Sequence, residues 1–238
     1  MNTATAQASL ATDRAAQPLG QIAVDLPGAT AIFRRLKLDF CCGGQTPLAQ
    51  ACEDKRLSLP EVLDALAQLD RPASKAVPQS TDEMIDHILK RFHAVHREQL
   101  PELIRMARRV EAVHRDNPHV PQGLSAHLEA MENELLDHMD KEETIVFPAL
   151  RGGAGLEARG PIQVMRDDHI GHGQMLERLI QLTDNGNPPP GACNTWRALY
   201  AGVIQLSDDL IEHIHLENNL LFPAFEKQTA CGPTCGCA

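Results

Sequence analysis

The chain contains HMDKEETIVFP at residues 138–148, and a segment of the same pattern, HIHLENNLLFP, occurs at residues 213–223. In both segments a glutamate follows a histidine by four positions. Residues four apart on an α-helix share a face and lie about 6 Å apart along its axis, so both side chains can bind one metal centre. The two segments therefore predict two metal-binding helices of matched design.

A lone histidine precedes each segment at nearly the same distance. His93 is separated from His138 by 44 residues, and His169 from His213 by 43 residues. One His-x3-Glu pair is common on amphipathic helices that bind nothing, but a repeated spacing calls for a repeated cause. The candidate metal ligands are His93, His138, Glu142, His169, His213 and Glu217.

This donor set suits a dinuclear site in the core of a four-helix bundle, to which each helix contributes inward-pointing ligands. Imidazoles and carboxylates are typical ligands of iron, manganese or zinc, and iron is favoured because open coordination positions then serve redox or diatomic-ligand chemistry. We expect His93 and His138 to bind one ion and His169 and His213 the other, with both glutamates bridging. The expected cofactor is two iron ions in an oxo- or hydroxo- and carboxylate-bridged di-iron centre.

The expected fold class is all-α, a small N-terminal helical domain followed by an antiparallel up-and-down four-helix bundle. Four long helical patterns cover residues 81–114, 123–150, 161–182 and 193–226, and loops with proline or glycine separate them. Short loops between long helices give antiparallel neighbours. Pro101 is expected to kink or break the first helix, and the two Phe-Pro steps to end or bend the second and fourth.

Changes of composition and proline-rich stretches divide the chain into five predicted segments. They are a disordered arm at 1–17, an N-terminal double-cysteine helical domain at 18–70, a linker at 71–80, the di-iron four-helix bundle at 81–228 and a cysteine-containing tail at 229–238.

Bulk properties argue against several classes of partner. The net charge is -10, and the basic residues are scattered, so we expect no nucleic-acid partner. No stretch of about 18 apolar residues occurs and the N-terminus lacks an export pattern, which predicts no membrane association and a cytoplasmic location. Seven cysteines, two of them adjacent, fit a reducing compartment.

The adjacent cysteines Cys41 and Cys42 precede Gly43 and Gly44, in a predicted turn. Backbone amides at a following helix start would lower the pKa of a thiol there, which suggests a thiol relay. Neighbouring cysteines rarely form a disulfide, so a dithiol is expected. The alternative is a pair of small buried residues in a tight turn.

The remaining cysteines carry less information. The tail thiols Cys231, Cys235 and Cys237 lack a fourth nearby ligand, so we interpret them as an auxiliary thiol tail. Cys52 and Cys193 belong to no pattern and are expected to be structural.

Four further residues lie close in sequence to the candidate ligands. His96 and His172 each follow a candidate histidine by three positions and are expected to lie behind the ligands or on the surface. Glu134 lies one helical turn before His138, and Asp168 adjoins His169. Either carboxylate is expected to hydrogen-bond a ligand or to carry protons and metal, with an ordinary solvated carboxylate as the alternative.

The chain resembles the Ric proteins, named for repair of iron centres. The resemblance rests on DFCCGG at 39–44, RFHAVHREQLPEL at 91–103 and the segments 138–143, 160–169 and 213–223. It implies a hemerythrin-like bundle with two irons, an N-terminal double-cysteine domain, and repair of iron-sulfur clusters damaged by nitrosative or oxidative stress.

The resemblance also implies roles for individual residues. It carries the iron ligands of the family onto the same six residues, and it matches Glu134 and Asp168 to family positions that are acidic near the metal. Position 173 is glycine, where oxygen-carrying hemerythrins have a second histidine on the third helix, so oxygen carriage is not expected.

Three functions are open at this point. The first is repair of damaged iron-sulfur proteins by iron delivery or nitrosyl handling, with Cys41 and Cys42 as the relay. The second is reduction of nitric oxide or peroxide at the irons, and the third is sensing of a diatomic ligand such as nitric oxide or a dioxygen-derived species. A homodimer is a possible assembly, because a flexible linker permits exchange of the N-terminal domain.

Overall fold

A computed structural model describes residues 14–26, 28–69 and 80–226, and every regular element among them is a helix. The expected all-α class is confirmed. The described residues form two units: 14–26, 28–69 and Ile214–Pro223 make up the smaller, and 80–213 with 224–226 make up the larger. The expected tail and residues 70–79 of the linker region lie outside the described residues, as do residues 1–13 of the expected arm, whereas residues 14–16 are helical.

The N-terminal part consists of four short helices, α2 (Leu19–Asp25), α3 (Ala29–Arg35), α4 (Leu48–Asp54) and α5 (Leu59–Ala67). Their apolar faces converge on a small core that includes Leu19, Phe33, Phe40, Leu48 and Leu66, none more than 1% exposed. Burial of these large side chains stabilises helices that are too short to persist alone in water.

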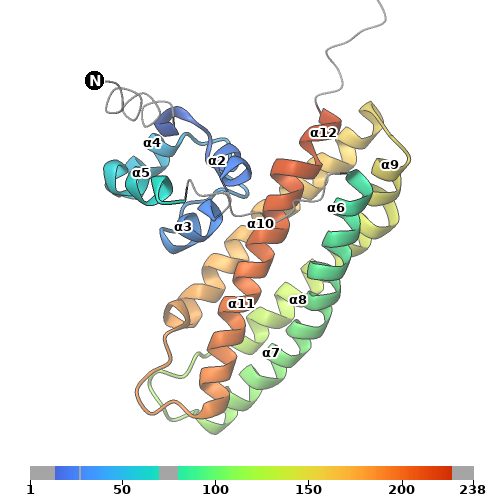
Figure 1. Cartoon of the computed structure of the whole chain (residues 1–238). Coiled ribbons are helices and arrows are strands. Elements are labelled where there is room, and N and C mark those ends of the chain that lie inside the picture. Colours follow the sequence, from blue (N-terminus) through green and yellow to red (C-terminus); the bar gives the residue numbers. More distant parts are fainter. Residues whose placement is uncertain (1–13, 27, 70–79, 227–238) are drawn as a thin grey trace, which may run out of the picture. The chain divides into compact units, whose positions relative to one another are not determined.

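Four long helical paths make up the larger unit, except that residues Ile214–Pro223 of the fourth path belong to the N-terminal unit; α7, α8, α10 and α11 run side by side (Figure 1). The first path is α6 (Thr81–Ile88), the π-helix η1 (Leu89–His93) and α7 (Ala94–Val113); the second is α8 (Leu124–Lys141), η2 (Glu142–Val146) and α9 (Phe147–Arg151). The third is α10 (Arg159–Leu182), preceded by η3 (Leu156–Ala158) and followed by η4 (Asp184–Gly186). The fourth is α11 (Asn194–Leu216), η5 (Glu217–Leu221) and α12 (Pro223–Glu226).

Local sequence explains where the first path begins. Ser80 precedes α6, and its hydroxyl accepts a hydrogen bond from the backbone N–H of Glu83 at 3.2 Å. This is the serine side of a capping box, and the acidic residues Asp82 and Glu83 add favourable charge to the first turn. The polar residues determine where the helix begins, and the buried Ile85 and Ile88 determine which face packs into the core.

Three π-helical turns interrupt the long paths of the described structure, and each begins or ends at a candidate ligand. Phe147 donates its N–H to the Glu142 carbonyl, five residues back, and Phe222 donates likewise to Glu217 at 2.9 Å. The prolines that follow cannot donate to the carbonyl four residues back, so the wider turn accommodates them. The helices therefore continue through both Phe-Pro steps instead of ending there.

Of the kink or break expected at Pro101, the break is not found, since α7 is continuous from Ala94 to Val113. The proline removes one backbone hydrogen bond, but the buried side chains of Leu100, Leu103 and Ile104 hold the surrounding turns in the core. Packing thus outweighs the local preference of proline to break a helix.

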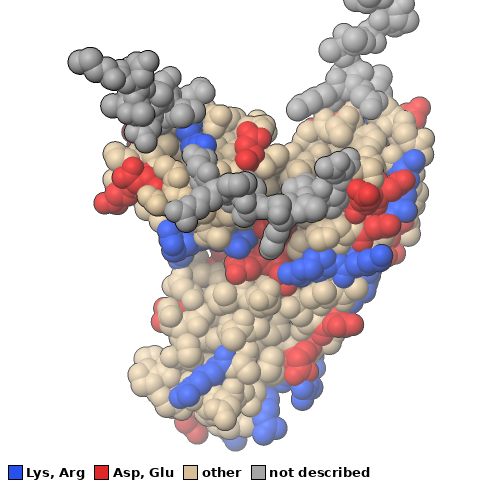
Figure 2. Space-filling view, viewed as in Figure 1, with Lys and Arg blue, Asp and Glu red and all other residues tan. Residues whose placement is uncertain are grey.

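Opposite charges alternate over the face seen in Figure 2. Ion pairs within the larger unit include Arg108 with Glu129 at 3.1 Å and Arg151 with Asp86 at 2.6 Å. The expectation of no nucleic-acid partner stays a prediction. None of the described helices combines the length and apolarity needed to cross a membrane.

The double-cysteine loop is held by side-chain amides. Within the N-terminal unit, Asn218 donates to the Cys41 carbonyl and Asn219 to the Phe40 carbonyl, both at 3.1 Å. A Cβ atom on Gly44 would lie 2.7 Å from the Phe40 carbonyl oxygen and 2.8 Å from the Asn219 side-chain oxygen. Glycine is therefore required at position 44 for close approach of the chain.

Gly44→Ala should destabilise the protein by about 1–3 kcal/mol, the usual range for overpacking a tight contact. Gly160→Ala is the matched control, because a Cβ at this helical position meets nothing within 4 Å. Chemical denaturation monitored by circular dichroism measures both. Equal stabilities of the two variants would contradict the close approach at Gly44.

Candidate metal centre

The six candidate ligands come from all four long paths and are all buried. His93 is the last residue of η1, His138 lies in α8, Glu142 opens η2 and His169 lies in α10, while His213 lies in α11 and Glu217 opens η5. Each is at most 1% exposed. The π-turns place three of these residues where the helical path shifts its register, a feature frequent at functional sites.

The ligand atoms fall into two groups, His93, Glu142, His213 and Glu217 in one and His138, Glu142, His169 and Glu217 in the other. Within each group the potential ligand atoms lie within 4.8 Å of one another. The two glutamates belong to both groups. Shared carboxylates between two imidazole pairs have the layout of a bridged dinuclear site.

Individual distances support this division. The Nε2 atoms of His93 and His213 are 3.2 Å apart, and those of His138 and His169 are 3.1 Å apart. One carboxylate oxygen of Glu142 lies 3.2 Å from His93 Nε2, and the other lies 3.4 Å from His138 Nε2. Glu142 therefore reaches both pairs.

The expected pairing of histidines was wrong. It joined His93 to His138 and His169 to His213, whereas the structure brings His93 to His213 and His138 to His169. Spacing along the chain favours partners in consecutive helices. In a closed bundle the first and last helices are also neighbours, so an imidazole from each can meet.

The chemistry of the site fits a cation. Burial, followed by the charge of nearby His93, holds the pKa of His213 well below its ordinary value, so this imidazole is neutral and keeps a lone pair for metal. Two carboxylates at 0% exposure are costly unless positive charge compensates them. Nitrogen and oxygen donors without cysteine are typical of iron or manganese sites, whereas structural zinc sites usually include thiolates.

An outer carboxylate orients one histidine of each pair. Glu143 lies 2.7 Å from His93 Nδ1 and 2.8 Å from Arg97, and Asp168 lies 3.3 Å from His138 Nδ1 and 3.1 Å from Lys141. Such partners fix the tautomer and ring orientation of a ligating histidine. The hypothesis that Asp168 hydrogen-bonds a ligand residue agrees with this contact.

Their hydrogen-bond partners lower the pKa of both outer carboxylates. Burial by itself would raise the pKa of Glu143, but hydrogen bonds from Arg97 and His93 outweigh it and leave the pKa below its ordinary value. The pKa of Asp168 is lowered in the same way, with burial outweighed by Lys141 and His138. Both groups are therefore anionic at neutral pH and accept hydrogen bonds.

Sequence reasoning missed Glu143, Arg97 and Lys141. Glu143 faces about 100 degrees away from the candidate ligand Glu142 on the helix, so its position in the sequence does not mark it as part of the site. Its partners come from another helix, so no spacing along one helix signals them. The salt-bridging cations carried no pattern at all.

His96 and His172 are buried beside the two pairs. The ring of His96 lies 5.6 Å from that of His213, and the ring of His172 lies 4.7 Å from that of His138. Burial, with the charges of neighbouring histidines, lowers the pKa of each to about 3. Both are therefore neutral, and of the two expected locations the structure selects the one behind the ligands.

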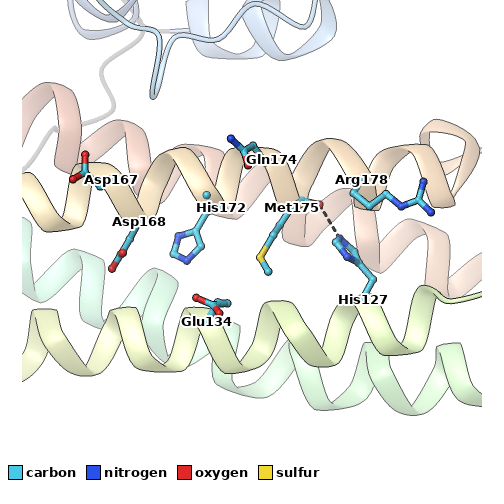
Figure 3. Close-up of a pocket in the computed structure, with 9 residues that line it drawn as sticks. His127, Glu134, Asp167, Asp168, His172, Gln174, Met175 and Arg178 are labelled. Atoms are coloured by element: carbon cyan, nitrogen blue, oxygen red, sulfur yellow. Dashed lines mark hydrogen bonds between the residues drawn. The ribbon is translucent and has the colours of Figure 1, made fainter.

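Glu134 does not join the buried groups. It is exposed on α8 and lines a pocket of about 430 Å³ with Asp168, His172 and Arg178 among others (Figure 3). Its accessory role stays a prediction.

The cysteine loop offers a second, smaller group. One ligand atom from each of Asp39, Cys41 and Cys42 lies within a common 4.8 Å. The two sulfur atoms are 3.8 Å apart and form no disulfide, and Asp39 accepts hydrogen bonds from the Cys41 thiol at 3.3 Å and from the Cys42 N–H at 2.9 Å. The arrangement can hold a soft cation when the thiols lose their protons.

The expected lowering of the thiol pKa was wrong for Cys41. A hydrogen bond with Cys42, burial, and the charges of Cys42 and Asp39 together hold its pKa well above the ordinary value. The next helix begins only at Leu48, so its amides lie too far along the chain to offset these effects. Without a cation Cys41 is therefore a protonated thiol.

Comparison with known proteins matches both parts of the chain to protein families. Residues 84–225 match the family described as hemerythrin HHE cation binding domain, and residues 15–70 match ScdA_N, described as a domain of unknown function, DUF542. The chain is 48% identical over 211 residues to the iron-sulfur cluster repair protein YtfE of Citrobacter koseri. It is 50% identical over 212 residues to the protein of that name from Escherichia coli O157:H7, and both alignments cover 87% of this chain and 95% of the relative.

Glu143→Gln should weaken iron binding about 10- to 100-fold, because the Nδ1 atom of His93 loses its carboxylate partner. Competition with a chromogenic iron chelator measures the affinity. Glu98→Gln is the matched control, since Glu98 is an exposed carboxylate on α7. Equal affinities of both variants would show that Glu143 does not orient the histidine.

Proposed function

Because the chain belongs to the hemerythrin HHE family and, along nearly its whole length, to the family of the iron-sulfur cluster repair proteins YtfE, we propose that it repairs damaged iron-sulfur clusters with a di-iron centre. The observation that carries the proposal is the pair of buried donor groups that share both glutamates. Damage by nitrosative or oxidative stress is the proposed setting.

In this proposal, two iron ions are the resident cofactor. His93 and His213 hold one ion, His138 and His169 hold the other, and Glu142 and Glu217 reach both. When bound, the ions supply redox chemistry and open coordination positions. The protein keeps the His213 imidazole neutral by burial, and the burial of all six residues excludes bulk water from the ligands.

Iron delivery is the favoured route of repair. A site of imidazoles and carboxylates binds ferrous iron less tightly than a cage of thiolates does, so it can release iron to a cluster that is being rebuilt. The absence of cysteine from both buried groups among the described residues supports release over permanent storage.

The cysteine loop is proposed as the relay. Cys41 and Cys42 with Asp39 offer two soft donors and one hard donor at ligand spacing. Because the pKa of Cys41 is raised, its thiol loses the proton only when a cation or a nitrosyl group binds to the sulfur instead. Such a group can take up iron or a nitrosyl group transiently. The clients are damaged iron-sulfur proteins, and a homodimer stays a prediction.

Anaerobically purified protein should contain about two iron ions per chain and should show visible absorption after oxidation. Glu142→Ala and Glu217→Ala should each lose most of the iron and the absorption, since each carboxylate belongs to both groups. Elemental analysis and absorption spectroscopy measure both quantities. Zinc alone, or full iron in both variants, would overturn the di-iron proposal.

The double variant Cys41→Ala, Cys42→Ala should keep its iron but lose repair of a nitrosylated iron-sulfur protein. Cys193→Ala is the matched thiol control, because Cys193 lies near His114 at 3.2 Å and outside the loop. Recovery of the client's enzymatic activity measures repair. Unchanged repair would refute the relay, and catalytic turnover of nitric oxide with an added reductant would favour the reductase function instead.

A further inference from the structure

We propose that Cys193 and His114 form a thiol–imidazole pair that accepts a nitrosyl group from low-molecular-weight S-nitrosothiols. The pair lies within the larger unit, at the end of the bundle where α7 ends and α11 begins (Figure 1). Along these two helical paths, His114 and Cys193 lie about 30 Å from the candidate ligands His93 and His213, respectively. The reaction is therefore separate from the buried metal centre and does not depend on the proposed function.

The two side chains are in contact although they come from different helical paths. The Nε2 atom of His114 lies 3.2 Å from the Sγ atom of Cys193. The His114 ring also packs against the ring of the fully buried Trp196, with centroids 5.0 Å apart, which holds the imidazole in place. An imidazole at this distance can take the proton of the thiol and leave the thiolate, which is the nucleophilic form.

The start of α11 favours the same anionic form. Cys193 directly precedes the helix, and its carbonyl accepts a hydrogen bond from the Arg197 N–H at 3.0 Å, so Cys193 is the N-cap residue. The positive end of a long helix stabilises a negative charge at this position, and no acidic residue of the first turn opposes it. Cys193 and His114 are both half-buried, and a half-buried thiol is open to small reagents.

Other described cysteines are less suited to this reaction. Burial raises the pKa of Cys52, which is 1% exposed. A hydrogen bond with Cys42, followed by burial, holds the pKa of Cys41 well above its ordinary value. Cys52 and Cys41 therefore stay protonated near neutral pH, whereas Cys193 has a base within reach of its proton. We expect Cys193 to react first.

The transfer needs no added oxidant or reductant. His114 Nε2 takes the thiol proton, and the Cys193 sulfur attacks the nitrogen of the S-nitrosothiol. The new S–N bond forms as the old one breaks, and the departing thiolate takes the proton from His114. The products are the S-nitroso form of Cys193 and a small free thiol, and the imidazole returns to its starting state.

S-nitrosoglutathione is the probe, added under anaerobic conditions to the full, iron-loaded chain. Free thiols are then alkylated, and mass spectrometry of the peptide that carries Cys193 gives the extent of nitrosation over time. This thiol should react faster than Cys52 and faster than the Cys41 and Cys42 pair. A rate at Cys193 no higher than at Cys52 would overturn the proposal, and this comparison needs no variant.

His114→Gln should slow the nitrosation of Cys193 about 10- to 30-fold. Glutamine offers the thiol a hydrogen-bond acceptor but cannot take its proton, and an unassisted thiol is only a few per cent thiolate at neutral pH. His119→Gln is the matched control, an exposed histidine in the loop that follows α7, and should react as wild type. Equal rates in the two variants would refute the role of His114.

The same measurement on protein stripped of iron by a chelator separates this site from the metal centre. Nitrosation of Cys193 should keep the wild-type rate, because the thiol lies about 30 Å from the nearest candidate ligand on its own helix. A large loss of rate without iron would show that the nitrosyl group reaches Cys193 through the metal, which would overturn direct transfer. The iron content of the untreated samples tests the di-iron proposal by itself.

Discussion

Two carboxylates without exposed surface, Glu142 and Glu217, are the constraint on which the rest of the bundle depends. Each must meet imidazoles from two sides, which requires all four helical paths to approach one point. The π-turns that begin at these glutamates widen the helix there and admit the prolines that follow. Apolar side chains on both sides keep water out, so the interaction of a cation with these donors is stronger than at a surface.

The two sides of the centre differ in their surroundings. Beside His93, Glu143 pairs with Arg97 and closes the site with an ion pair. Beside His138, Asp168 pairs with Lys141 but also borders the pocket that contains Glu134 and His172. The same outer contact, a carboxylate on Nδ1, thus has an ion-pair partner on both sides and borders an open pocket on only one of them.

The cysteine loop complements the buried centre chemically. The buried groups offer hard and borderline donors, whereas Cys41 and Cys42 offer soft sulfur, and the Cys41 thiol is protonated at rest. Asn218 and Asn219 follow Glu217 directly in the chain and hold the loop through two backbone carbonyls. One short stretch, residues 217–219, therefore serves both kinds of site.

The sequence by itself determined the helical class and the resemblance to a repair family, and it predicted the six residues that the structure gathers into two buried groups, because helical periodicity and repeated spacing are local properties of the chain. It gave the wrong histidine pairs and the wrong sign for the pKa of Cys41. It could not have found the Arg97 to Glu143 contact or the pocket beside His172. These depend on which helices become neighbours and on how far each side chain is removed from water, and only the tertiary structure decides both.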